Sequence, residues 1–129
     1  MKEIWRWSVK VGIVGSRRWH NREMVEALVE ELPVDTTIVS GGCRGVDSWA
    51  AEAAARRGLG VIVHVPDLPS SGSPYWEFTK AYHARNLKIA EDSDIIYAFV
   101  AEDRKGGTEN TIKHARKLGV PVEVITEGE

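Results

Sequence analysis

The sequence has few features of membrane, secreted or metal-rich proteins. Cys43 is the single cysteine of the 129-residue chain, so the chain can form no intramolecular disulfide and no cysteine-rich metal site. No apolar run approaches the roughly 20 residues that a membrane-spanning helix needs. Residues 1–10 are too short and too charged for a secretory signal. We therefore expect a cytoplasmic protein that contacts no membrane.

Excess positive charge and the common nucleotide-binding motifs are also missing. The formal net charge is −2, so bulk electrostatics does not favour non-specific binding to nucleic acid, which stays an open but disfavoured partner. Neither a G-x-G-x-x-G pattern nor a Walker loop occurs. The four histidines show no metal-ligand spacing. We expect no metal and no resident cofactor.

Strand-like and helix-like segments alternate along the whole chain. Alternating or β-branched runs predict strands at residues 5–13, 36–40, 61–65, 94–100 and 121–125. The third is nearly all apolar, as expected for a strand covered on both faces. Apolar spacing predicts helices at 22–32, 48–57, 75–91 and 108–118, the third of them interrupted near its start. Asn21 is the expected N-cap of the first helix, and Gly58 and Gly119 are expected C-terminal stops.

This alternation predicts parallel strands joined by right-handed crossovers. We expect one domain over residues 1–129, an α/β Rossmann-like three-layer sandwich with a five-stranded, mainly parallel sheet. In such sheets ligands bind outside the carboxyl ends of the strands. Each glycine-rich break that follows a strand is therefore a candidate binding segment.

The first two breaks combine glycine with groups that are suited to bind an anion. Gly15, Ser16 and Arg17 form either an ordinary turn or an anion grip. In the second, which runs from Gly41 to Asp47, three glycines leave backbone N–H groups uncovered at the start of a helix, which favours an anion. Within this second break Asp47 is interpreted as a helix cap, Arg44 as an added charge, and Cys43 as a small turn residue rather than a nucleophile.

Two further segments carry candidate ligand contacts. The break before the last helix contains Arg104, Lys105, Gly106, Gly107 and Thr108, whose amides, hydroxyl and charges suit a phosphate. Glu109 follows as either a base, a ribose ligand or an ordinary first-turn acid. Within the preceding helix, Arg85 and Asn86 suit a phosphate or ribose, although a solvated helix face is the simpler interpretation. The aromatic side chains nearby favour core or dimer packing over base stacking; they are Tyr75, Trp76, Phe78 and Tyr82.

In this order and spacing, the motifs resemble the SLOG superfamily. That Rossmann-like group includes the DNA-processing protein DprA and the LOG phosphoribohydrolases, and the chain is most similar to its small single-domain branch related to YspA and YpsA. The resemblance spans residues 10–125 and implies a nucleotide-type pocket at the strand ends. Two departures stand out: Arg104 and Lys105 replace two glycines of the usual loop, and Thr111 stands where LOG enzymes need a glutamate.

Three functions therefore compete, and whether the chain is an enzyme stays open. The leading prediction is a domain that binds or senses a nucleotide-type small molecule, as a homodimer in which Trp5, Trp7 or the aromatic stretch supplies the surface. The alternatives are an N-glycosidase of nucleoside monophosphates with Glu109 as catalytic residue, and a DprA-like module for single-stranded DNA. The predicted ligand residues are Gly15, Ser16, Arg17, Gly41, Gly42, Arg44, Gly45, Asp47, Arg85, Asn86, Arg104, Lys105, Gly106, Gly107, Thr108 and Thr111.

Overall fold

The computed structural model describes residues 9–127, and its elements follow the predicted order. The strands are Lys10–Gly15 (β1), Thr37–Ser40 (β2), Gly60–Val63 (β3), Ile95–Val100 (β4) and Val122–Thr126 (β5). The helices are Arg22–Glu30 (α1), Val46–Arg57 (α2), Tyr75–Asp92 (α3) and Gly107–Leu118 (α4). The part of the first predicted strand that contains Trp5 and Trp7 lies outside the described residues.

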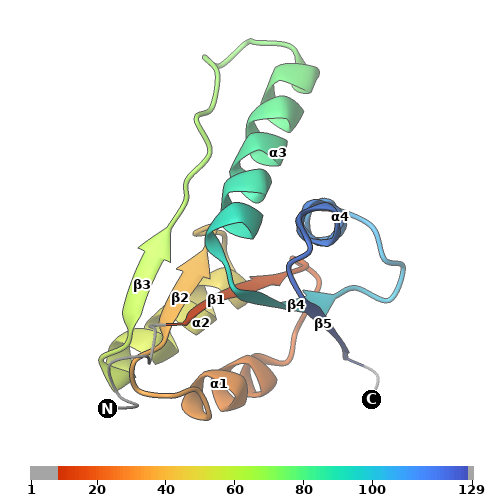
Figure 1. The fold of residues 1–129 in the computed structure, drawn as a ribbon. Helices are drawn as coiled ribbons and strands as arrows, with labels where there is room; N and C mark the ends of the chain where they lie inside the picture. The colour runs from red at the N-terminus through yellow and green to blue at the C-terminus, as the bar shows by residue number, and fades with distance from the viewer. Residues whose placement is uncertain (1–8, 128–129) are drawn as a thin grey trace.

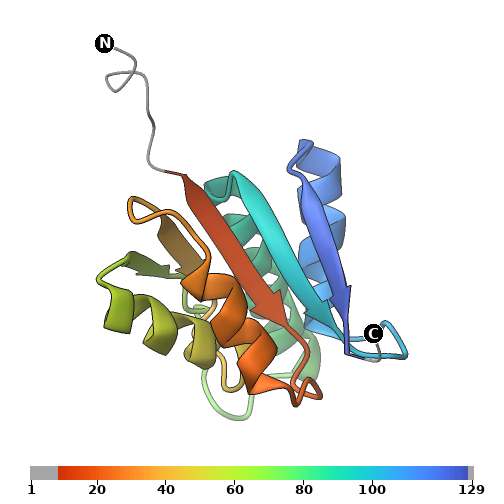
Figure 2. The same ribbon diagram turned by 90° about the horizontal axis from the view of Figure 1, so that it is seen from below.

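All five strands are parallel and lie in the order β3-β2-β1-β4-β5. Helices α1 and α2 cover one face of the sheet and α3 and α4 the other (Figures 1 and 2). The predicted α/β three-layer sandwich with a five-stranded sheet is therefore confirmed. The chain runs outward from β1 to β3 on one side and returns through β4 to β5 on the other. This makes the β1–β4 boundary the switch point at which such folds bind ligands.

Alternation along β1 builds the two halves of the core. Ile13 faces α1 and α2, where it packs in one apolar cluster with Trp19, whereas Val14 faces α3 and α4 and packs with Ile89. Side chains of successive strand residues point to opposite faces, so a strand covered on both sides is apolar throughout. The central strands are thus held rigidly, and the loops at their carboxyl ends start from fixed positions.

The helix boundaries follow the predicted capping residues. The Asn21 side chain accepts a hydrogen bond from the Met24 amide (3.1 Å), which confirms it as the N-cap of α1. Gly58 and Gly119 end α2 and α4 at φ angles of 74° and 77°, a left-handed conformation that glycine adopts without strain. Helix α3 is continuous, so the predicted interruption near its start is wrong.

The structure corrects one packing expectation and narrows another. Among the described strands, β3 pairs only with β2 and lies at the sheet edge, and Val61 and Val63 are 37% and 47% exposed instead of covered on both faces. The first turns of α3 stand clear of the sheet (Figure 1), where Tyr75 and Trp76 are 85% and 61% exposed. Core packing therefore does not apply to these two aromatic side chains. Among residues 9–127, no helix is both long enough and apolar enough to cross a membrane.

Candidate functional site

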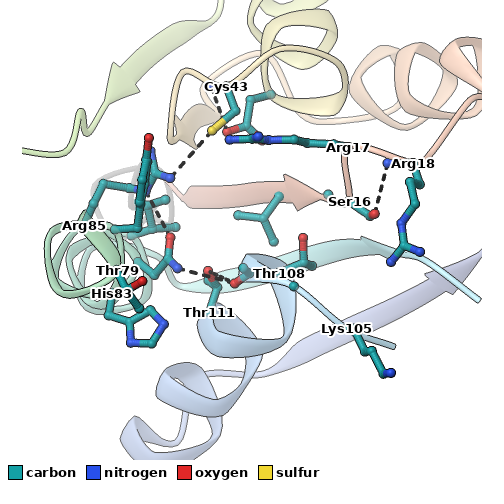
Figure 3. A pocket seen from close by; sticks show the side chains of 18 of the residues that line it. Ser16, Arg17, Arg18, Cys43, Thr79, His83, Arg85, Lys105, Thr108 and Thr111 are labelled. Atoms are coloured by element: carbon teal, nitrogen blue, oxygen red, sulfur yellow. Dashed lines mark hydrogen bonds between the residues drawn. The ribbon is translucent and has the colours of Figure 1, made fainter. Parts of the chain in front are cut away.

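A cavity of about 650 Å³ lies at the carboxyl ends of the central strands, beside the β1–β4 boundary. We call it the main cavity (Figure 3). Val14 and Ile89 form its apolar floor. Its remaining lining comes from four segments: Gly15, Ser16, Arg17 and Arg18 after β1; Cys43 and Asp47 after β2; Tyr75, Thr79, Tyr82, His83, Arg85 and Asn86 on α3; and Lys105, Gly106, Gly107, Thr108 and Thr111 around the start of α4.

The turn after β1 brings two arginines to this cavity in different states. The Ser16 amide donates to the Phe99 carbonyl (2.9 Å), which ties the turn to β4. Arg18 forms a two-pronged ion pair with Asp103, with N–O distances of 2.6 and 2.8 Å. The Arg17 side chain is exposed and has no hydrogen bond or ion pair with any other described residue. Figure 3 shows it running from the end of β1 toward Cys43. Arg17 is therefore a cation available to a ligand.

In the loop after β2, backbone amides that were predicted to be free donate hydrogen bonds to side chains of the protein. The amides of Gly41 and Cys43 both donate to Oδ2 of Asp47 (3.2 Å each), and the Gly42 amide donates to Oγ of Ser40 (3.2 Å). These N–H groups are not uncovered. Nor does Asp47 cap the helix: the N-cap is Gly45, which makes no side-chain capping bond. Asp47 instead folds the loop back onto the start of α2.

Burial dominates the electrostatics of Asp47. Its side chain sits at the base of the loop with 5% of the residue exposed, and desolvation raises the pKa of its carboxyl from 3.8 to about 6. The amides of Cys43 and Gly41 and the positive charge of Arg85 act in the opposite direction and favour the ionised form. The carboxyl of Asp47 therefore titrates close to neutral pH while it holds the loop.

Arg85 and Asn86 are buried, at 6% and 4% exposure, so the interpretation as a solvated helix face is wrong. Arg85 donates from Nη1 to the Gly41 carbonyl (2.6 Å) and from Nε to Oδ1 of Asn86 (3.0 Å). Asn86 in turn donates from Nδ2 to Oδ1 of Asn110 (3.1 Å) and to the Gly107 carbonyl (3.4 Å). The pair thus connects α3 to the loop after β2 and to the start of α4.

Helix α4 begins at the edge of the main cavity with unused hydrogen-bonding capacity. Its N-cap, Gly106, has a φ angle of 110° and makes no side-chain capping bond. The first amides of a helix lack intrahelical partners and carry partial positive charge. Thr108 and Thr111 lie beside them, buried to 7% and 2% exposure. Lys105 borders the same cavity, but its side chain points out of it in Figure 3.

Several predicted site residues lie elsewhere. Arg104 and Glu109 form an ion pair, with Nε to Oε2 at 2.7 Å, outside the main cavity. The structure therefore does not bring Glu109 to the position that a catalytic role at this cavity requires. Four residues of the loop after β2 line a neighbouring cavity instead; they are Gly41, Gly42, Arg44 and Gly45.

This neighbouring cavity, which we call the second cavity, has a volume of about 820 Å³. It shares part of its wall with the main cavity, namely Arg17, Cys43, Tyr82 and Arg85. The rest of its lining consists of the glycine-loop residues together with Trp19, His20, Trp49, Val65 and Pro66. Among residues 9–127, the lining includes cationic and aromatic side chains but no aspartate or glutamate.

Arg18, which adjoins Arg17 and was expected to bind an anion with it, lines the main cavity, and so do Thr79 and His83, which were not predicted as site residues. A helical pattern would have indicated Thr79, because Tyr75, Thr79, Tyr82 and Asn86 follow one another at intervals of four, three and four. Residues at that spacing share one face of a helix. Assigning Asn86 to the site therefore predicts the rest of this stripe.

Comparison with known proteins gives three findings that agree with this fold. Residues 9–70 match the model of a family described as YspA, cpYpsA-related SLOG. Over 121 residues the chain is 34% identical to the Gene 61 protein of Mycobacterium phage D29, covering 88% of this chain and 93% of that protein. The structure of the present chain is similar to that of DNA processing protein A (DprA) from Streptococcus pneumoniae, with a TM-score of 0.73 and 24% identity. That likeness covers 91% of this chain but 50% of the DprA chain, and it shows the fold alone.

Proposed function

The chain belongs to the YspA, cpYpsA-related SLOG family, and we propose that its main cavity binds a nucleotide-type ligand through the ligand's phosphate. One observation carries this proposal: the Arg17 side chain, which pairs with no other described residue, and the start of α4, which has no side-chain cap among the described residues, border the same cavity. A guanidinium and a helix N-terminus both favour an anion, and together they suit a phosphate. A volume of about 650 Å³ also lies in the range of small-molecule sites.

Some lining residues of the main cavity would contact the ligand, and others would hold its walls in position. Arg17, Ser16, Gly107 and Thr108 would meet the phosphate, and Lys105 would swing in from the rim. Arg85 and Asp47 would act as supports, since both already hold the loop after β2. Tyr75, Thr79, Tyr82 and Asn86, on the inner face of α3, would contact the ribose and base. A homodimer stays part of the prediction, with Trp76 as exposed surface outside the main cavity.

The arrangement supports binding or sensing rather than N-glycosidase chemistry. Glu109 is engaged by Arg104 outside the cavity. The acid that does line the main cavity, Asp47, accepts hydrogen bonds from two loop amides and is almost fully buried. A general base must reach the proton that it removes, directly or through one water. Neither carboxylate is placed to do so without breaking the contacts that hold it.

Calorimetric titration with a panel of nucleoside monophosphates tests the proposal. We expect the wild type to bind at least one of them, and Arg17→Ala to weaken that binding about tenfold, which corresponds to about 1.4 kcal/mol. Arg116→Ala is the matched control, because Arg116 is an exposed arginine of α4 that does not line the main cavity. Absence of binding across the whole panel, or equal losses in the two variants, would overturn the proposal.

A further inference from the structure

The shared wall between the two cavities combines positive charge with access from both sides. Arg17 and Arg85 both belong to it, and each therefore borders the main and the second cavity. Figure 3 shows that Arg17 lies along this boundary, with its guanidinium end near Cys43. Arg85 is fixed there by the Gly41 carbonyl and lies over the Tyr82 ring, 5.7 Å from its centroid. Charge is thus concentrated where the two cavities meet.

The second cavity combines an exposed cation with an apolar and aromatic wall. Arg44 is exposed and makes no hydrogen bond or ion pair with any other described residue through its side chain, as is also true of Arg17. Trp49, Val65 and Pro66 supply an apolar and aromatic wall. The loop's Gly45 is the N-cap of α2 and makes no side-chain capping bond, so the start of α2 adds a partial positive charge nearby.

From this geometry we infer that the ligand has two halves joined by a pyrophosphate and occupies both cavities. The inference rests on the proposed function, since it places one nucleotide half in the main cavity. The linking phosphates would lie against Arg17 at the boundary, and the second ribose unit would enter the second cavity beside Arg44 and Trp49. Each cavity lies in the size range of a single small-molecule site, and a mononucleotide would leave the second cavity and its unpaired cation unused.

Arginine suits the linking group because its planar fork binds two phosphate oxygens at once. A pyrophosphate that links two sugars carries one negative charge on each phosphate, whereas a phosphodiester link carries a single charge, so the pyrophosphate suits a boundary that presents the exposed Arg17 guanidinium to both cavities. The expected ligand class is therefore a nucleoside diphosphate that bears a second ribose unit, or a dinucleotide joined in the same way.

Titration of the wild type with ADP-ribose and with AMP tests this inference. We expect ADP-ribose to bind at least about tenfold more tightly than AMP, at one molecule per chain. Arg44→Ala should remove that advantage and leave the AMP affinity unchanged, because Arg44 lines the second cavity but not the main cavity. Arg17→Ala should weaken both ligands, and the control Arg116→Ala should weaken neither.

Tryptophan fluorescence gives a second readout that reports on position. Trp49 lines the second cavity, so ADP-ribose should change the emission and AMP should not. In Trp49→Phe most of that change should be lost, because Trp19, which lines the same cavity, is almost fully buried; circular dichroism checks that the variant is folded. Equal affinities for AMP and ADP-ribose, two AMP molecules per chain, or an unchanged ADP-ribose affinity in Arg44→Ala would each overturn the two-cavity inference. In those cases binding of AMP still supports the proposed function, whereas absence of binding by ADP-ribose and by every nucleoside monophosphate of the panel refutes both.

Discussion

Replacement of Asp47 by asparagine should change the pH dependence of stability in a defined direction. Burial raises the pKa of the Asp47 carboxyl from 3.8 to about 6 in the folded protein. Over the interval between these values the folded chain keeps a proton that the unfolded chain has lost. A pKa difference of about two units corresponds to about 3 kcal/mol of unfolding free energy.

The sign follows from which state binds the proton. Below the unfolded pKa both states are protonated, and Asp47 carries no charge to bury. As the pH rises through 3.8 toward 6, the unfolded state ionises first, so the free energy of unfolding falls. Above about pH 6 the full penalty of about 3 kcal/mol is present. Asparagine has nearly the same shape, accepts the same amide hydrogen bonds through Oδ1 and never ionises, so Asp47→Asn escapes this loss.

Urea unfolding of both proteins at about pH 3.5 and about pH 7.5 measures the effect. The stability of the wild type minus that of Asp47→Asn should fall by about 3 kcal/mol between the two conditions. All other titrating groups are shared and cancel in this difference. A difference that is independent of pH, or that rises with pH, would refute the reasoning.

Asp92→Asn provides a control of opposite sign. Hydrogen bonds from Lys10 and then from His64 lower the pKa of the Asp92 carboxyl. A carboxyl with a lowered pKa stabilises the fold once it is ionised, and that contribution is lost as the pH falls through the folded pKa. The wild type should therefore gain stability over Asp92→Asn as the pH rises through the acidic range.

Two further substitutions test the site's geometry. Gly15→Ala should destabilise the protein by about 1–3 kcal/mol, because the new Cβ would lie 2.6 Å from Cβ of the buried Val46. In Gly107→Ala the new Cβ would have Nδ2 of Asn86 as its nearest neighbour, 3.9 Å away. Thermal unfolding should therefore show a clearly lower melting temperature for Gly15→Ala than for Gly107→Ala. Glu109→Gln should leave the affinity for nucleoside monophosphates unchanged, since Glu109 pairs with Arg104 outside the main cavity; a marked loss of binding in calorimetry would restore Glu109 to the site.

The fold was predictable because its signals are local and agree with one another. Apolar periodicity marks the strands and helices, and Asn21, Gly58 and Gly119 mark three helix ends at the observed positions. The coverage of β3 was not predictable in the same way. A short apolar segment such as residues 61–63 can form either an edge strand or a central strand. Which of the two it forms depends on the crossovers of the whole chain.

The place of the main cavity was predictable, whereas the hydrogen bonding of its polar groups was not. Because the strands are parallel, the turns after β1, β2 and β4 all lie at the end of the sheet where the strands have their carboxyl termini. Glycine content then indicates accessible amides, but it does not show whether a side chain of the protein has already taken them. Asp47 takes those of Gly41 and Cys43, and the sequence contains no local signal for this beyond an acid near the start of a helix.

The same distinction decides which arginines are available to a ligand. Arg17, Arg18, Arg44 and Arg85 look alike as charges that accompany glycine-rich or helical motifs. In the structure Arg85 is buried against the Gly41 carbonyl and Arg18 is held by Asp103, whereas Arg17 and Arg44 are exposed and unpaired with described residues. A cation already neutralised or fully hydrogen-bonded by the protein must lose those contacts before it binds an anion, and an unpaired one loses only water. We therefore propose that the two arginines without a partner among the described residues, Arg17 at the shared wall and Arg44 in the second cavity, recognise the charge of the ligand, and that Arg18 and Arg85 hold the walls in place.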